Sequence, residues 1–115
     1  MKILCPSKPK SPYREVIEEL SKRAGVDVIF TKKLPEVKGV KVLLDRRGEP
    51  VNMEKLGRIV EKNPTFIVGG PEGIEIEADH VLSLGDYTLN HQIAIIVLLD
   101  LLFRVKNPRH PYTKH

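Results

Sequence analysis

The segment from Leu89 to Val105 is long enough for a helix of several turns, and apolar residues occupy every position from Ile93 to Phe103 except Asp100. A helix that is apolar on all sides must be buried on all sides. In a chain of 115 residues, one sheet can cover only one side of such a helix. We therefore expect a second copy of the chain to cover the other side, and a homodimer is the simplest arrangement. The alternative is that the first helix and the C-terminal tail cover it within one chain.

Short apolar runs alternate with helical patterns along the rest of the chain. The runs are apolar throughout, which is typical of strands in a parallel sheet that is covered on both faces. The expected strands are Lys2 to Cys5, Val26 to Phe30, Val40 to Leu44, Thr65 to Val68 and His80 to Leu84, with a turn from Arg46 to Pro50. One further expected helix runs from Pro12 to Ala24 and is capped by Ser11. Another is capped by Asn52 and ends near Glu61. The residues of this second helix that we expect to face the core are Met53, Leu56, Ile59 and Val60. This order predicts an α/β fold with a mainly parallel five-stranded sheet flanked by helices.

Length and composition narrow the class of protein. We expect one domain over residues 1–115, and no transmembrane segment, because Asp100 ends the longest apolar run, from Ile93 to Leu99. The net charge of +4 favours polyanions such as RNA as partners, although many basic surfaces serve only solubility. The single cysteine, Cys5, excludes an internal disulfide and fits a cytoplasmic protein. The histidines and Cys5 lack the spacing of metal ligands, so we expect no metal site.

Glycines follow the fourth expected strand, in the stretch Gly69-Gly70-Pro71-Glu72-Gly73. They permit a tight turn, and they equally permit the backbone to approach a ligand closely. The stretch matches neither a Walker loop nor the dinucleotide fingerprint, so pyrophosphate binding is disfavoured.

A second loop joins the last expected strand to the last helix, from Leu82 to His91. It can present backbone N–H and C=O groups to an adenine or a ribose. The alternative is a purely structural loop in which Thr88 or Asn90 caps the helix. We expect His91, in the first helical turn, to be neutral, because a positive charge there opposes the helix dipole.

The tail from Arg104 to His115 is basic and contains Tyr112. Cations beside an aromatic ring suit an RNA backbone and a stacked base. A frayed basic terminus is the alternative.

Four stretches together resemble the SPOUT class of RNA methyltransferases, and most closely the family that methylates N3 of a pseudouridine in large-subunit ribosomal RNA. They occur in the family's order from about Val40 to the C-terminus. They are Leu43-Leu44-Asp45 with Gly48, Phe66 to Gly73, Leu82-Ser83-Leu84 with Thr88-Leu89 and His91, and Leu102-Phe103-Arg104 with His110-Pro111-Tyr112.

The resemblance implies a C-terminal trefoil knot, a homodimer and bound S-adenosylmethionine. Carried over by position, the cofactor-binding residues would be Leu44, Gly69, Gly70, Leu84, Gly85, Asp86, Tyr87, Thr88 and Leu89. Arg104, His110 and Tyr112 would be the catalytic residues, and they would reach the RNA and the methyl donor of the partner chain. Candidates for a general base are Glu72, His91 and His110.

The chain departs from this family in two places. Family members are usually longer, mainly between Phe30 and Val40, where a helix near the substrate face is missing here. Thr113 stands where another histidine is common. Three alternatives therefore stay open: a methyltransferase for another ribosomal or transfer RNA site, a non-catalytic protein that binds the cofactor and RNA, and a small flavodoxin-like binding domain.

Overall fold

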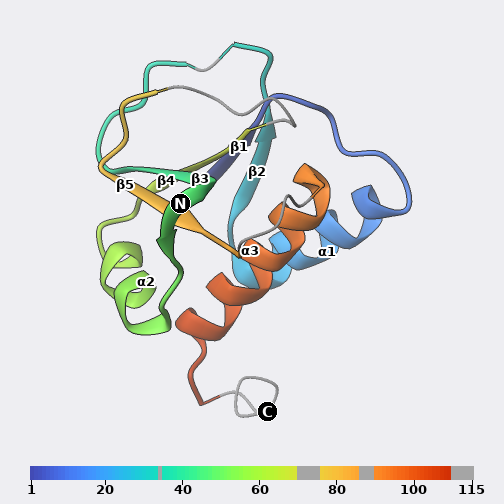
Figure 1. Cartoon of the computed structure of the whole chain (residues 1–115). Helices are drawn as coiled ribbons and strands as arrows, with labels where there is room; N and C mark the ends of the chain where they lie inside the picture. The colour runs from blue at the N-terminus through green and yellow to red at the C-terminus, as the bar shows by residue number, and fades with distance from the viewer. Residues whose placement is uncertain (34, 70–75, 86–89, 110–115) are drawn as a thin grey trace.

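The computed structural model describes residues 1–33, 35–69, 76–85 and 90–109. In this part of the chain, strands and helices alternate as expected (Figure 1). The strands are β1 (Lys2–Cys5), β2 (Asp27–Phe30), β3 (Lys41–Pro50), β4 (Thr65–Val68) and β5 (His80–Ser83). The helices are α1 (Tyr13–Ala24), α2 (Met53–Val60) and α3 (His91–Lys106). Each predicted strand and helix is present, and only β3 differs in its bounds by more than two residues.

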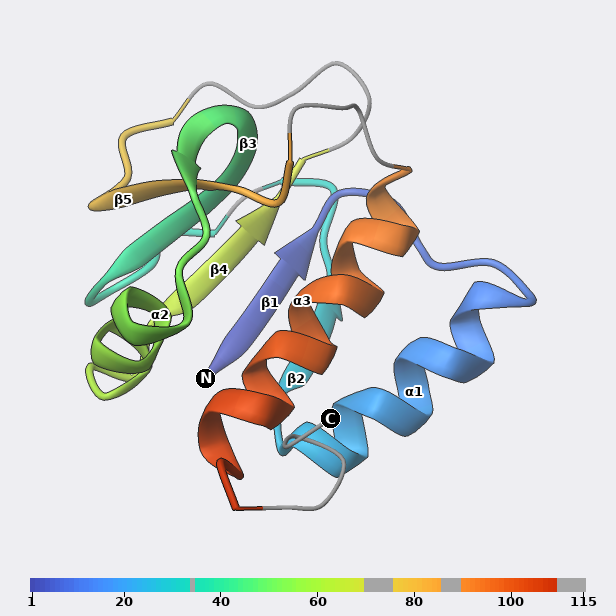
Figure 2. The same ribbon diagram turned by 60° about the horizontal axis from the view of Figure 1, so that its bottom comes forward.

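All neighbouring strands are parallel and lie in the order β2-β1-β4-β3-β5, which confirms the predicted parallel sheet. The β1–α1–β2 and β3–α2–β4 connections cross the sheet in the same direction, so right-handed crossovers place α1 and α2 on one face. Figure 2 shows α3 on that same face, between α1 and α2. The described parts of the β2–β3 and β4–β5 connections lie on the other face (Figure 1). Helices therefore cover one face of the sheet, and the described parts of these two connections, which are not helical, cross the other.

Alternate side chains of the central strands enter two buried layers. Ile3, Val42 and Phe66 are fully buried in the core between the sheet and the helices. Leu4 and Ile67 point to the opposite face and are also buried. This burial on both faces explains why the central strands carry successive apolar residues instead of alternating apolar and polar ones.

Helix α3 lies at the centre of the helical layer. Ile95, Leu98, Leu99 and Leu102 each have 0% exposed surface, and α1 and α2 pack on either side of the helix. A stripe on its remaining side is only half-buried. This α3 stripe consists of Ile93, Ile96, Val97 and Leu101. The sheet and the other helices thus bury most of α3 within one chain, and only the α3 stripe remains for a second copy to cover.

Hydrogen bonds tie both ends of α3 to the region of α1. Near its start, the buried Gln92 side chain accepts a hydrogen bond from the Lys10 backbone N–H at 2.5 Å. At its end, Lys106 Nζ donates to the Ala24 carbonyl at 2.6 Å, where the negative end of the α1 dipole favours a cation. Lys106, which belongs to the basic tail that we expected to face RNA, therefore has a structural partner.

The helix caps agree with the sequence in two of three cases. Asn52 Oδ1 accepts hydrogen bonds from the backbone N–H groups of Glu54 and Lys55, and Asn90 Oδ1 accepts one from Gln92. The predicted Ser11 cap is wrong, because Pro12 is the N-cap residue of α1 and the Ser11 hydroxyl donates to the Glu15 carboxylate instead.

The prediction that Met53 faces the core is also wrong. Its side chain is 41% exposed, because the first residue of α2 lies before the turn that packs on the sheet through Leu56 and Ile59.

Strand β3 leaves the sheet and then returns to it. Leu44 pairs with Leu82 of β5, and Glu49 then pairs with the same residue, so Asp45–Gly48 form an excursion between two paired segments. We call these residues the β3 excursion. The predicted turn from Arg46 to Pro50 is wrong at its end, because Glu49 and Pro50 resume pairing with β5.

Gly48 brings the β3 excursion close to β5. A Cβ atom on Gly48 would lie 2.5 Å from the backbone oxygen of Val81, a distance that real contacts do not show. Only glycine therefore permits this approach between two backbones.

We expect Gly48→Ala to lower the free energy of unfolding by about 1–3 kcal/mol, because the added methyl group overlaps the β5 backbone. Gly57→Ala in α2 is the matched control. Its Cβ would meet only Val105 Cγ1, at 3.8 Å, and alanine favours a helix, so we expect a gain of about 0.5–1 kcal/mol. Urea unfolding measures both changes. Equal effects at the two positions would contradict the close approach at Gly48.

Candidate functional site

The first paired segment of β3, which ends at Leu44, meets the carboxyl ends of β4 and β5 at one edge of the sheet. Leu44 of β3 lies between Val68 of β4 and Leu82 of β5 in the strand register. The residues that follow these strands therefore start side by side. Ligands of open parallel sheets bind beyond this edge, which makes it the first place to look for a site.

Four of the nine expected cofactor-binding residues lie at this edge. They are Leu44, Gly69, Leu84 and Gly85, and all four are half-buried. The other five, Gly70, Asp86, Tyr87, Thr88 and Leu89, lie outside the described residues. His110, Tyr112 and Glu72 lie outside them as well.

Ser83 shapes the turn that leaves β5. Its hydroxyl donates a hydrogen bond to the Gly85 carbonyl at 2.8 Å and accepts one from the Gly85 N–H at 3.1 Å. Gly85 has a backbone φ angle of 155°, which residues other than glycine rarely adopt. The Ser83 side chain is buried, so the turn is built into the end of the strand. We did not predict this role, and the signal in the sequence is a serine two residues before a glycine at a strand end.

The β3 excursion carries charge to the same edge. Arg47 donates to both carboxylate oxygens of Asp45, with Nε–Oδ1 at 3.0 Å and Nη2–Oδ2 at 2.8 Å, and its backbone N–H donates as well. These hydrogen bonds, led by those of the side chain, lower the pKa of Asp45 to about 2. Asp45 is therefore ionised at neutral pH and is unsuited to act as a base there.

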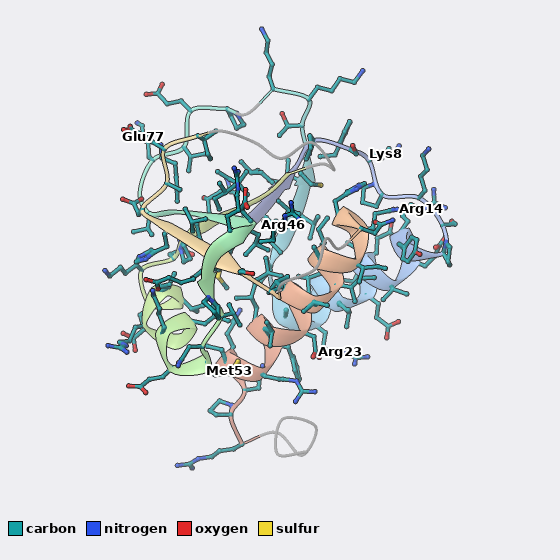
Figure 3. The ribbon with its side chains drawn as sticks, in the orientation of Figure 1. Lys8, Arg14, Arg23, Arg46, Met53 and Glu77 are labelled. Carbon is teal, nitrogen blue, oxygen red and sulfur yellow. The ribbon has the colours of Figure 1, made fainter. Side chains whose placement is uncertain are left out.

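Arg46 and Arg47 are the functional candidates that we missed in the sequence. Both follow Leu44 directly, and Figure 3 shows Arg46 beside β3. Two arginines after a strand end in a parallel sheet are a signal for an anion-binding edge, but we expected only a turn there.

His91 is the first residue of α3. Its Nε2 atom is buried and has no hydrogen-bond partner among the described residues. Burial lowers the pKa of His91, which agrees with the neutral state that we expected. A neutral imidazole nitrogen can accept a proton, so His91 stays a candidate base.

Arg104 lies at the other end of α3. It follows His91 by 13 positions, which corresponds to ~20 Å along a helix. Its Nε donates to Asp100 Oδ2 at 3.1 Å, and both side chains are about 30% exposed. Within one chain, the structure therefore does not bring Arg104 to the edge that carries Leu44, Gly69 and Leu84 (Figure 2).

The described residues give little support to a reactive cysteine, a metal site or a membrane-spanning helix. Burial raises the pKa of the Cys5 thiol, and Sγ donates to the Ile29 carbonyl at 3.7 Å, so this cysteine is structural. The described ranges contain no cluster of three or more potential metal ligands. No helix in them is long and apolar enough to cross a membrane.

Comparisons with known proteins identify relatives over most of the chain. A family model described as "Predicted SPOUT methyltransferase" matches residues 2–112. Two strains of Thermus thermophilus each have a protein named Ribosomal RNA large subunit methyltransferase H that is 35% identical over 132 aligned positions, covering 97% of this chain and 96% of the relative. The protein of that name from Campylobacter concisus is 33% identical over 88 positions, covering 70% of this chain and 58% of the relative.

These matches confirm the resemblance found in the sequence, and they extend it from the C-terminal two thirds to nearly all residues. The chain therefore belongs to the SPOUT methyltransferase family.

Proposed function

We propose that this protein transfers a methyl group from S-adenosylmethionine to large-subunit ribosomal RNA, with N3 of a pseudouridine as the target. Family membership and the names of the relatives support the reaction and the class of substrate. The observation that carries the proposal is the meeting of Leu44, Gly69, Leu84 and Gly85 at one edge of the sheet. We further propose that residues 1–115 act as one domain, because one buried core contains residues from Ile3 to Phe103. We place the protein in the cytoplasm because its proposed substrate is ribosomal RNA.

The residues at this edge fit S-adenosylmethionine. Leu44 and Leu84 are half-buried aliphatic side chains, which suit the faces of an adenine ring. Gly69 and Gly85 have no side chain, so they allow a ligand to approach the backbone. These four residues, with Gly70 and Asp86 to Leu89, would hold the cofactor, which supplies the methyl group and its own positive charge.

The protein's part in methyl transfer is mainly orientation and charge. The residues at the edge hold the donor in line with the RNA base. N3 of a uracil-type base must lose a proton, and a nearby guanidinium stabilises the resulting anion. Arg104 is our candidate for that cation, with His110 and Tyr112 beside it, and His91 is a candidate for the base.

The separation of Arg104 from the edge favours a homodimer. About 20 Å of helix lies between the two in one chain. The α3 stripe beside Arg104 is apolar and half-buried, as suits a contact with a second copy. We propose that Arg104 and the tail of one chain complete the site of its partner, and that the C-terminal segment forms the family's trefoil knot. The knot is supported by membership of the family alone.

The cofactor site is tested by a pair of glycine variants. Gly85 and Gly39 have φ angles of 155° and 87°, which residues with a side chain rarely adopt, so alanine strains the backbone at both positions, by about 1–3 kcal/mol each. We expect Gly85→Ala to weaken S-adenosylmethionine binding at least about tenfold, because relief of the strain moves the turn after β5. Gly39→Ala should leave the affinity unchanged. Calorimetric titration of both folded variants measures this, and equal affinities would remove Gly85 from the site.

The reaction is tested by transfer of a labelled methyl group to ribosomal subunits. We expect label in large-subunit RNA and none in small-subunit RNA or transfer RNA, and mapping of the labelled nucleotide should give N3 of a pseudouridine. Label in transfer RNA would favour the alternative target. Saturable cofactor binding without any label would favour the non-catalytic alternative.

The shared site is tested by mixing two impaired variants, Arg104→Ala and Gly85→Ala, at a concentration of S-adenosylmethionine that leaves Gly85→Ala unsaturated. We expect Arg104→Ala to lower the turnover number about 100-fold while the affinity for S-adenosylmethionine is kept. In a mixed dimer with Gly85→Ala, the cofactor pocket of one chain and Arg104 of the other are both intact. Mixing the two variants, with subunit exchange verified, should therefore restore activity above that of either alone. No recovery would place Arg104 outside the partner's site.

A further inference from the structure

Two basic loops leave the carboxyl edge of the sheet side by side, at the end of this edge that β1 and β2 form. Cys5 at the end of β1 pairs with Phe30 at the end of β2, and the Thr31 N–H donates to the Cys5 carbonyl at 2.9 Å. The first loop, residues 6–12, contains Lys8 and Lys10 and no acid. The second begins with Thr31-Lys32-Lys33. All four lysines are exposed. We call residues 6–12 and 31–33 the lysine loops.

An aromatic residue directly precedes the second of the lysine loops. Phe30 is 40% exposed at the last position of β2, which is the outer strand of the sheet. Lys8 extends from the same end of the molecule in Figure 3. An exposed ring near several cations matches a single-stranded nucleic acid, whose bases stack on the ring and whose phosphates pair with the lysines.

The lysine loops are held in place by hydrogen bonds. The Lys10 N–H donates to the buried Gln92 side chain, and the Thr31 hydroxyl donates to the Lys33 carbonyl at 2.5 Å. The surface therefore exists before a ligand arrives, which lowers the entropic cost of binding.

We propose that Phe30 and the lysine loops bind single-stranded RNA next to the nucleotide that is methylated. This inference rests on the proposed function and adds the surface that positions the substrate. β2 lies three strand positions from β3 in the sheet, which is ~14 Å at the usual strand spacing. Phe30 is thus too far from Leu44 to hold the target base, and it stacks on a neighbouring base of the same strand. Stacking requires an unpaired base, so the surface selects single strands over duplexes.

The test compares Phe30→Ala with Met53→Ala, a control whose side chain is equally exposed, at 41%, but lies on α2. We expect Phe30→Ala to raise the KM for large ribosomal subunits about tenfold, with the affinity for S-adenosylmethionine unchanged. Phe30→Trp should restore the wild-type KM, which a merely structural role would not do. Met53→Ala should have the wild-type KM.

The lysines are tested by the salt dependence of binding to a labelled single-stranded RNA of mixed sequence, read by fluorescence anisotropy. Loss of two phosphate contacts in Lys32→Ala/Lys33→Ala should reduce the slope of log K against log salt by about 1.4. The control Lys22→Ala/Lys62→Ala removes the same charge elsewhere and should keep the wild-type slope.

The two readouts separate this inference from the proposed function. If the wild type methylates RNA but the Phe30 and Lys32/Lys33 variants behave as their controls do, the surface is wrong and the function stands. If the wild type methylates nothing, the anisotropy experiment still decides: altered binding in these variants alone supports the surface, and unaltered binding overturns it. Equal binding to duplex and single-stranded RNA would also overturn it.

Discussion

Burial of α3 between the sheet, α1 and α2 is the contact on which the rest of the structure depends. Its central leucines and Ile95 have no exposed surface, and each such side chain contributes about 1.5–3 kcal/mol on transfer from water. This packing fixes the start of α3, where the Asn90 cap and the Gln92 side chain lie. On the β5 side, the two hydrogen bonds between the Ser83 hydroxyl and Gly85 fix the turn that follows the strand. The candidate cofactor loop is thus held at both of its described ends by the core, with no need for a ligand to order them.

The same helix separates two kinds of chemistry. Its first turn lies at the carboxyl edge of the sheet, with the glycines and half-buried leucines that suit a neutral ligand pocket. Its last turns carry Arg104 and Lys106 to the opposite end. A rigid helix does not fold back on itself, so a reaction that needs both ends needs two helices. A dimer that brings the last turns of α3 in one chain to the first turn of α3 in its partner satisfies this condition. The α3 stripe offers the apolar contact for such a dimer.

Local patterns predicted the elements well, and long-range pairing explains what they missed. β1 and β4 begin and end as expected, because turn residues border each apolar run. The return of β3 at Glu49 depends on the edge of β5, some thirty residues later, and no local signal marks it. In the sequence, Lys106 was interpreted as part of a basic tail. Its hydrogen-bond acceptor, the Ala24 carbonyl, is a backbone group distant in sequence, which no local pattern reveals. The position of the ligand edge could be predicted from the strands alone, because ligands of parallel sheets bind at the carboxyl ends. The ion pair between Asp45 and Arg47 could not be predicted, because it depends on the β3 excursion, where the chain leaves the sheet.

The two hydrogen bonds that tie α3 down each join residues 82 positions apart. Contacts between distant residues slow folding, because a long stretch of chain must be closed before they form. Helix α3 also follows all five strands, α1 and α2 in the chain. The strands and α1 therefore leave the ribosome with their apolar faces uncovered, and they stay so until α3 arrives. Until then the nascent chain exposes an apolar sheet face that invites aggregation or chaperone binding.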